Sequence, residues 1–211
     1  MFLPLYDLER IKKARDKKSS TKHTESKLTA LFSGRMEINK GALLFLQAAK
    51  ITANRNPSVY RFVMIGDGSA CDSLQKYVNE NGLQSCVALK GHLDAESVIK
   101  ELTAAQVLLM PTTSAFSEAL GKSMIEAALA NTPSIVSRVV PGSKLLNKSC
   151  IVVNEDDESE IAEALLYLAA NRQKLYEPSI GNVEQKAEFF NASNGLNCAV
   201  EKILKNFHKP R

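Results

Sequence analysis

The sequence lacks a long apolar run, a secretion signal and a strong charge of either sign. No apolar stretch approaches the roughly 20 residues that are needed to span a bilayer, and no signal peptide is visible at Met1. The net charge of the 211-residue chain is only +4, which is too small to indicate a nucleic-acid partner. We therefore expect a cytoplasmic protein that binds no nucleic acid.

Closely spaced cysteines, which would suggest a zinc site or a disulfide framework, are also missing. The four cysteines are far apart and include no Cys-x-x-Cys pair: Cys71, Cys86, Cys150 and Cys198. Three of them fall inside expected helices or strands, so the sequence favours buried, reduced thiols.

From position 28 onward the chain alternates regularly between apolar strands and amphipathic helices. We expect strands at 28–34, 60–68, 86–91, 105–111, 133–137 and 150–153, and helices at 41–56, 69–82, 94–105, from Ala119 onward, and at 158–176. Strands that are apolar throughout indicate a parallel sheet covered on both faces. The predicted fold class is therefore α/β, a Rossmann-like, doubly wound parallel sheet of about six strands with C-terminal helices. Ligands of such sheets bind outside the carboxyl ends of the strands.

The expected organisation has three parts. Residues 1–26 form a linker or N-terminal helical extension, residues 27–177 the Rossmann-like domain, and residues 178–211 C-terminal helices that pack on it. Within positions 10–23 the extension carries seven Lys or Arg against one Asp. A solvated helix and linker is the favoured interpretation, and peripheral contact with an anionic membrane surface is the alternative.

A glycine-rich segment, GDGSAC, follows the second expected strand. It imitates a dinucleotide fingerprint, but Cys71 stands where the third glycine of that motif would be. We favour a tight strand-to-helix turn built on Gly66 and Gly68 over a redox-cofactor site.

The segment SGRMEINKG leaves the first strand through Gly34 and enters a helix at Gly41, with Arg35 and Lys40 between them. Glycine lets a backbone approach a ligand closely, and a helix N-terminus favours an anion. Two cations at this point could neutralise a diphosphate, but a surface loop with two solvated charges has the same spacing. The residues alone leave both interpretations open.

Two glutamates, Glu118 and Glu126, lie eight positions apart around Gly121 and Lys122. If the helix begins near Ala119, Glu126 lies about 12 Å further along its axis than Glu118. The spacing of both acids from Lys122 also suits a solvated stripe of ion pairs. Gly121 in the first turn would cost roughly 1 kcal/mol relative to alanine, which suggests that a ligand approaches the backbone there.

Two further features have ordinary interpretations. The acidic run 154–160 (NEDDESE) precedes a long helix, where acidic residues favour the helix dipole and cap its end, so we favour capping over a metal site. His92 follows a strand at the ligand-facing edge, and we favour a structural or solvent-exposed role for it.

Together these segments resemble the C-terminal domain of retaining GT-B glycosyltransferases of the family 4 type. The resemblance spans about 28–171 and keeps the family's order of segments: FSGRMEINKG, FVMIGDG, VALKGHL, AAQVLLMPTTSAFSEALGKSMIEAALANTPSIVS and CIVVNEDDESEIAEALLYL. The signature of two glutamates separated by seven residues is met by Glu118 and Glu126. Leu120 replaces the Phe that the family usually has before Gly121, which keeps an apolar contact there.

The resemblance implies a role for each matching residue. Arg35 and Lys40 would bind the diphosphate of a nucleotide sugar, Glu118 would meet the transferred sugar, and Glu126 would bind the ribose hydroxyls. The implied catalytic residues are Glu118, Arg35 and Lys40. The implied nucleotide-sugar-binding residues are Gly34, Arg35, Lys40, Gly66, Gly91, His92, Glu118, Leu120, Gly121, Lys122 and Glu126.

The resemblance also implies an activity. The chain would be the donor-binding half of a hexosyltransferase that uses a UDP- or GDP-sugar without metal or other cofactor, because fixed cations stabilise the leaving diphosphate. The N-terminal acceptor-binding domain of the family is missing from this chain, so it should transfer sugar poorly or not at all alone. The alternatives are a non-catalytic module for protein or membrane association and a sugar-nucleotide epimerase.

Overall fold

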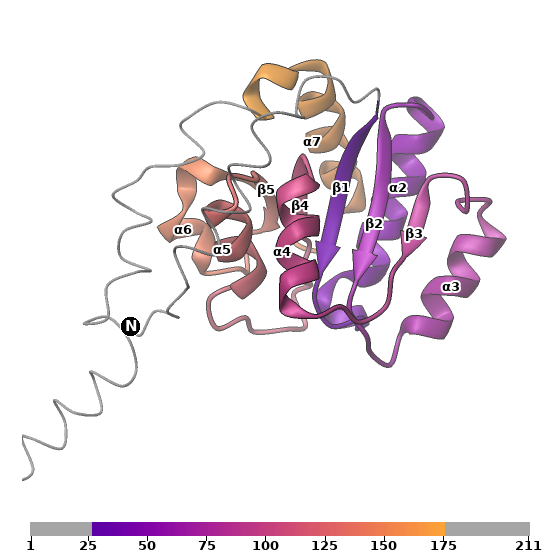
Figure 1. The fold of residues 1–211 in the computed structure, drawn as a ribbon, viewed down its shortest axis with the longest axis horizontal. Coiled ribbons are helices and arrows are strands. Elements are labelled where there is room, and N and C mark those ends of the chain that lie inside the picture. The colour runs from indigo at the N-terminus through magenta and orange to yellow at the C-terminus, as the bar shows by residue number, and fades with distance from the viewer. Residues whose placement is uncertain (1–26, 176–211) are drawn as a thin grey trace, which may run out of the picture.

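A computed structural model of the chain describes residues 27–175, which form a parallel sheet between two layers of helices (Figure 1). The strands are β1 (Leu28–Ser33), β2 (Tyr60–Ile65), β3 (Val87–Leu89), β4 (Val107–Met110), β5 (Ser134–Ser137) and β6 (Cys150–Val153). All pair in parallel, in the spatial order β3-β2-β1-β4-β5-β6. The predicted Rossmann-like, doubly wound α/β fold with six strands is confirmed.

The helices of the described part follow the strands in the predicted order. They are α2 (Ala42–Arg55), α3 (Cys71–Glu80), α4 (Ala95–Ala104), α5 (Lys122–Leu129), α6 (Gly142–Leu145) and α7 (Glu158–Ala170), with 3-10 turns η1 (Ile38–Lys40), η2 (Asn147–Ser149) and η3 (Arg172–Leu175). The predicted extension at 1–26 and the predicted C-terminal helices at 178–211 lie outside the described residues and remain predictions.

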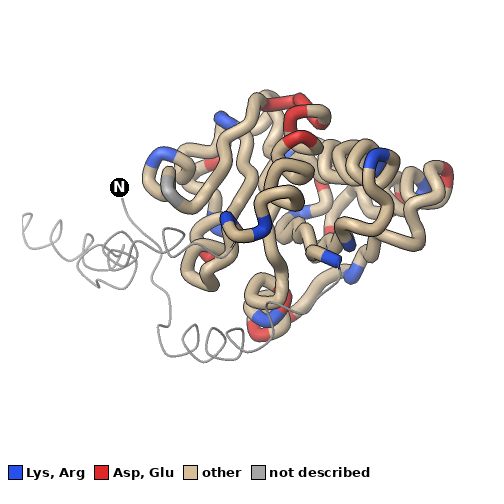
Figure 2. The backbone as a smooth tube through the Cα atoms, turned by 90° about the horizontal axis from the view of Figure 1, so that it is seen from above, with Lys and Arg blue, Asp and Glu red and all other residues tan. Residues whose placement is uncertain are grey.

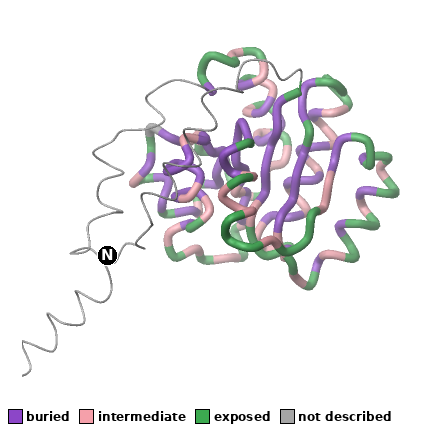
Figure 3. Tube along the Cα trace, viewed as in Figure 1, coloured by how far each residue is buried: buried purple, intermediate pink, exposed green. Residues whose placement is uncertain are grey.

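The sheet separates two hydrophobic layers, because successive side chains of a strand point to opposite faces. Ala30 and Phe32 of β1 belong to the layer beneath α2 and α7, whereas Leu31 packs with residues of α4 and α5. Phe45 of α2 meets Phe32 edge-on, with ring centroids 5.9 Å apart. Figure 3 shows the buried strands at the centre and the exposed outer surfaces of the helices.

The acidic run before α7 caps that helix. Asp157 accepts a hydrogen bond from the backbone N–H of Glu160 at 2.8 Å, and Glu160 reaches back to accept one from the backbone N–H of Asn154 at 2.6 Å. Asp94 caps α4 in the same way, through the backbone N–H of Ser97. These contacts agree with capping, the favoured interpretation of the run.

The start of α5 differs from the prediction. The sequence predicts a helix from Ala119, whereas α5 begins at Lys122 because its N-cap, Gly121, has φ 87° and ψ 67°, in the left-handed region. A Cβ on Gly121 would also lie 2.7 Å from Cγ1 of Val140. The turn and its packing therefore require this glycine, so it gives no sign of a ligand, and Glu118 lies on the loop before the helix.

The end of α7 and the β5–β6 connection also differ from the prediction. The sequence predicts one helix at 158–176, but α7 ends at Ala170 and a separate 3-10 turn, η3, follows. The short elements α6 and η2 were not predicted, because four-residue and three-residue turns are too short to show a helical period.

The described surface carries charges of both signs, with Lys and Arg interspersed among Asp and Glu (Figure 2). Exposed pairs one helical turn apart, such as Lys76–Glu80 on α3 and Glu96–Lys100 on α4, account for some of them. Between residues 27 and 175, no helix is long and apolar enough to cross a membrane.

The strand order reverses direction at β1 and β4, the switch point where ligands of such sheets bind. Pairing between these two strands runs only from Ala30–Val107 to Leu31–Leu108, two residues before either strand ends. Beyond that point the hydroxyl of Ser123, in the first turn of α5, donates a hydrogen bond to the carbonyl of Ser33, the last residue of β1. The carboxyl ends of β1 and β4 are therefore not paired with each other, and a loop leaves the sheet from each of them.

Candidate functional site

Two loops that leave the switch point, one after β1 and one after β4, are tied to each other. The backbone N–H and the hydroxyl of Thr113 both donate hydrogen bonds to the carbonyl of Asn39, at 3.1 and 3.0 Å. Gly41, with φ 77°, closes the first loop, and a Cβ on it would lie 1.8 Å from the carbonyl oxygen of Pro111. These contacts hold both loops in place without a ligand.

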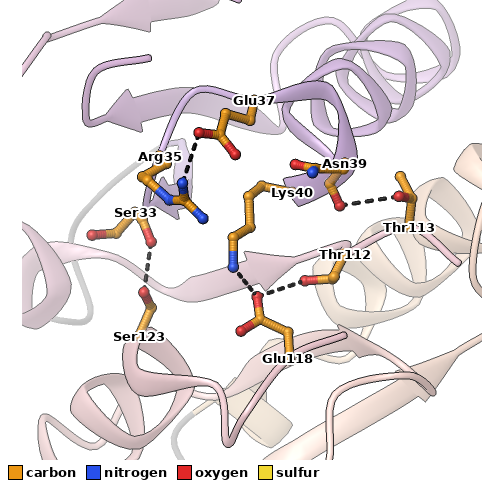
Figure 4. Close-up of polar contacts among 9 residues, drawn as sticks. All are labelled: Ser33, Arg35, Glu37, Asn39, Lys40, Thr112, Thr113, Glu118 and Ser123. Carbon is orange, nitrogen blue, oxygen red and sulfur yellow. Dashed lines mark hydrogen bonds and ion pairs between the residues drawn. The ribbon is translucent and has the colours of Figure 1, made fainter. Parts of the chain in front are cut away.

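An ion pair between Lys40 and Glu118 joins the two loops (Figure 4). Lys40 Nζ lies 2.6 Å from Glu118 Oε1, and the two side chains are only 17% and 10% exposed. The hydroxyl of Thr112 donates a longer hydrogen bond, of 3.3 Å, to the same carboxylate oxygen. The structure thus brings together two predicted catalytic residues that are 78 positions apart in the chain.

Phe116, on the loop after β4, lies against the predicted cations. Lys40 Nζ is 3.6 Å from the centre of its ring, and Arg35 Cζ is 6.0 Å from the same point. Arg35 itself is 60% exposed and pairs with Glu37 at 2.9 Å (Figure 4). Sequence reasoning missed Phe116, although an aromatic residue in a polar loop two positions before Glu118 was a visible signal.

The N-terminus of α5 opens at the same edge of the sheet. Within residues 27–175, no acceptor takes the backbone N–H of Lys122 or of Ser123, as expected of a first helical turn. Leu120 and Gly121 form the preceding turn, which packs so closely on the start of α6 that a Cβ on Gly142 would lie 2.2 Å from the carbonyl oxygen of Leu120. Unpaired N–H groups and the helix dipole make this end favourable for an anion.

Glu126 lies one turn further along α5. Its carboxylate is 3.5 Å from the ammonium of Lys122, and its side chain is 21% exposed, against 75% for the lysine. Burial raises the pKa of Glu126 above its ordinary value, and the nearby Lys122 offsets only part of that shift. Glu118 and Glu126 therefore lie on different elements and have different partners.

Three of the predicted glycines continue the hydrogen bonding of the sheet at its carboxyl edge. Gly34 donates to the carbonyl of Ile65 at 3.0 Å, and Gly66 donates to the carbonyl of Gly91 at 2.8 Å. Gly68 lies so close to the loop after β1 that a Cβ would be 2.5 Å from the carbonyl oxygen of Met36. These contacts support the turn interpretation of the glycine-rich segment, since each close approach is to backbone.

His92 is exposed beside this edge, near Asp67. The pKa of Asp67 is lowered mainly by the hydrogen bond from the backbone N–H of Gly68, with a small contribution from His92. In the described part of the chain, no group of three or more His, Cys, Asp or Glu side chains gathers as metal ligands would.

The arrangement combines fixed cations, helix N–H groups and a carboxylate at one rim of the sheet. Lys40 and the start of α5 can attract an anion such as a phosphate, and the carboxylate of Glu118 can accept hydrogen bonds from hydroxyl groups. Of the other predicted site residues, Arg35 and Lys40 both lie near the ring of Phe116. Glu126 pairs with Lys122, and His92 lies near Asp67.

Comparisons with known proteins agree with this fold. Among curated relatives, the D-inositol 3-phosphate glycosyltransferase of Paenarthrobacter aurescens (strain TC1) is 29% identical over 140 residues, which are 64% of this chain and 34% of that protein. Anabaena HepE in complex with UDP-glucose has a TM-score of 0.74 at 16% identity, over 96% of this chain and 56% of that one. The C-terminal domain of the Francisella tularensis glycosyl transferase group 1 family protein LpcC has a TM-score of 0.68 at 19% identity, over 90% of this chain and 96% of that domain.

The chain spans about one third of the length of the curated relative, and both structural likenesses are of the fold alone. A family model described as "Glycosyl transferases group 1" matches residues 27–171, which is more than half of the chain. The chain therefore belongs to the glycosyl transferases group 1 family.

Proposed function

We propose that this chain is the donor-binding, C-terminal half of a retaining, metal-independent glycosyltransferase of GT-B type. Its site would take a UDP- or GDP-linked hexose at the switch point between β1 and β4. The observation that carries the proposal is the shielded Lys40–Glu118 pair, which joins the two loops that leave the switch point; the unpaired N–H groups at the start of α5, which follows the second loop, add to it. The UDP-glucose bound by Anabaena HepE, a protein of similar fold, supports the class of donor.

The chemistry of the proposed reaction suits these groups. When the bond between sugar and diphosphate breaks, negative charge grows on the leaving nucleoside diphosphate and must be stabilised by groups already in position. Lys40 and Arg35 would supply that positive charge without a metal ion. Glu118 would accept hydrogen bonds from the sugar hydroxyls, and Glu126 from those of the ribose.

The acceptor is proposed to be a glycan or a lipid-linked sugar that is bound by a second, N-terminal domain. LpcC, whose C-terminal domain is matched over 96% of its length, supports the C-terminal placement of this half. We therefore expect the present chain to bind a nucleotide but to transfer sugar poorly or not at all by itself. Peripheral contact with an anionic membrane, and a cytoplasmic location, remain part of the proposal.

Calorimetric titration with UDP, GDP and ADP tests the proposal. We expect one of the first two to bind with a dissociation constant in the micromolar to millimolar range, and Arg35→Ala to weaken it about tenfold. Lys76→Ala is the matched control, because Lys76 is an exposed, ion-paired cation on α3. If no nucleotide binds, or if Arg35→Ala and Lys76→Ala bind equally well, the assigned site is wrong.

A further inference from the structure

We propose that Phe116 is a positioning residue, which holds the Lys40 ammonium in place for the diphosphate of the donor. The inference rests on the proposed function, since it assumes that Lys40 binds phosphate. It assigns to an unpredicted aromatic side chain a role in the electrostatics of the site rather than in the hydrophobic core.

The geometry around Lys40 Nζ gives the ammonium two fixed partners. Glu118 Oε1 accepts one of its three N–H groups at 2.6 Å, and the ring of Phe116 lies 3.6 Å away, a distance typical of a cation–π contact. The negative face of the ring attracts the cation without removing its charge. At least one N–H group is therefore left for an incoming anion.

The ring also limits the competition from Glu118. The Glu118 carboxylate offsets the charge of the Lys40 ammonium and attracts it in competition with a phosphate. The contact with the Phe116 ring is a second attraction that holds the ammonium in place against this competition. With leucine at position 116, the apolar volume would remain, but Lys40 would be held by Glu118 alone.

The position of the Phe116 backbone is itself tied to the loop that carries Lys40. The backbone N–H of Phe116 donates to the carbonyl of Thr113 at 3.2 Å, and Thr113 donates twice to the carbonyl of Asn39, the residue before Lys40. Arg35 lies 6.0 Å from the ring centre and is mostly exposed, so it gains less from the ring than Lys40 does.

Two substitutions at position 116 separate the role of the ring from its bulk. Phe116→Leu should weaken UDP binding about three- to tenfold in calorimetry, whereas Phe116→Tyr, which keeps the ring, should bind within about twofold of the unsubstituted chain. Uridine, which has no phosphate, should bind all three proteins equally. If Phe116→Leu leaves UDP affinity unchanged, or if both variants lose affinity for UDP and uridine alike, the positioning role is refuted.

A measurement without any nucleotide distinguishes failure of this inference from failure of the proposed function. In NMR spectra of the unliganded chain, the protons of the Lys40 side chain next to Nζ should be shifted upfield by the ring, and Lys40→Met identifies them by their loss. The shift should persist in Phe116→Tyr and disappear in Phe116→Leu. An ordinary Lys40 shift in the unsubstituted chain would overturn the inference, while a ring-shifted Lys40 together with no nucleotide binding would overturn the proposed function instead.

Discussion

Removing the ammonium of the Lys40–Glu118 pair should lower the free energy of unfolding, because it leaves a carboxylate that is shielded from water without its cation. Lys40→Met keeps most of the apolar stem of the side chain but removes the ammonium. Among residues 27–175, the Glu118 carboxylate then retains only the 3.3 Å hydrogen bond from Thr112. With 10% of its side chain exposed, Glu118 cannot regain full hydration. We therefore expect Lys40→Met to destabilise the fold, and Glu118→Gln in the same chain to relieve part of the loss.

The expected coupling free energy between Lys40 and Glu118 follows from the distance between their charged atoms and from the burial of their side chains. At the 2.6 Å between Lys40 Nζ and Glu118 Oε1, two unit charges attract by about 6 kcal/mol at an effective dielectric constant of about 20. Desolvation of both groups and the ordering of two side chains offset most of this attraction. We expect a coupling free energy of about 1–3 kcal/mol between the two positions.

Urea unfolding of the four proteins of this double-mutant cycle measures the coupling. The exposed pair Lys76–Glu80, whose charged atoms are 3.7 Å apart, provides the control cycle, with an expected coupling of about 0.5 kcal/mol or less. Added salt should weaken the control coupling but change the coupling of the shielded pair little. Equal coupling free energies in the two cycles would refute the reasoning.

Three further predictions concern other parts of the structure. Gly121→Ala should lower the free energy of unfolding by about 2–4 kcal/mol, because it adds a clash with Val140 to the strain of a left-handed backbone. Gly82→Ala, at φ 64° with open space around it, should lower it by only about 1–2 kcal/mol, and equal losses in urea unfolding would show that the clash is absent. Burial raises the pKa of Glu126 in the folded state, so the fold loses stability as the pH rises from the pKa of the unfolded chain through the raised pKa. Glu126→Gln should therefore raise the melting temperature more at pH 7 than at pH 4, and an equal rise at both pH values would contradict this. Excess EDTA should leave UDP affinity unchanged in calorimetry, and a clear loss of affinity would contradict metal independence.

The sequence predicted the fold well because the signals of a parallel sheet are local. Each strand is a short apolar run and each helix has its own period, so the order of elements can be read without knowing any contact. The rule that ligands bind at the carboxyl edge then placed the loops after β1 and β4 at the site. Lys40 and Glu118, predicted from those two loops, are in direct contact.

The errors lie where a contact between distant segments decides the structure. Gly121 looked like a costly residue within a helix, but its conformation and its packing against Val140 make it the residue that precedes one. Phe116 gave no helical or strand period, and its meaning depends on Lys40, which lies 76 positions earlier in the printed sequence. The local pattern shows an aromatic residue in a polar loop, but it does not show that Lys40 lies against its ring.

The bonds between Thr113 and Asn39 have a practical consequence. Because these bonds already join the two loops, the loops should lose little conformational freedom when a ligand binds, and the affinity should depend mainly on the chemistry of the ligand. On the proposed function, nucleotide analogues can therefore be ranked by their affinity for this chain, and the preferred base identified before any acceptor sugar is known.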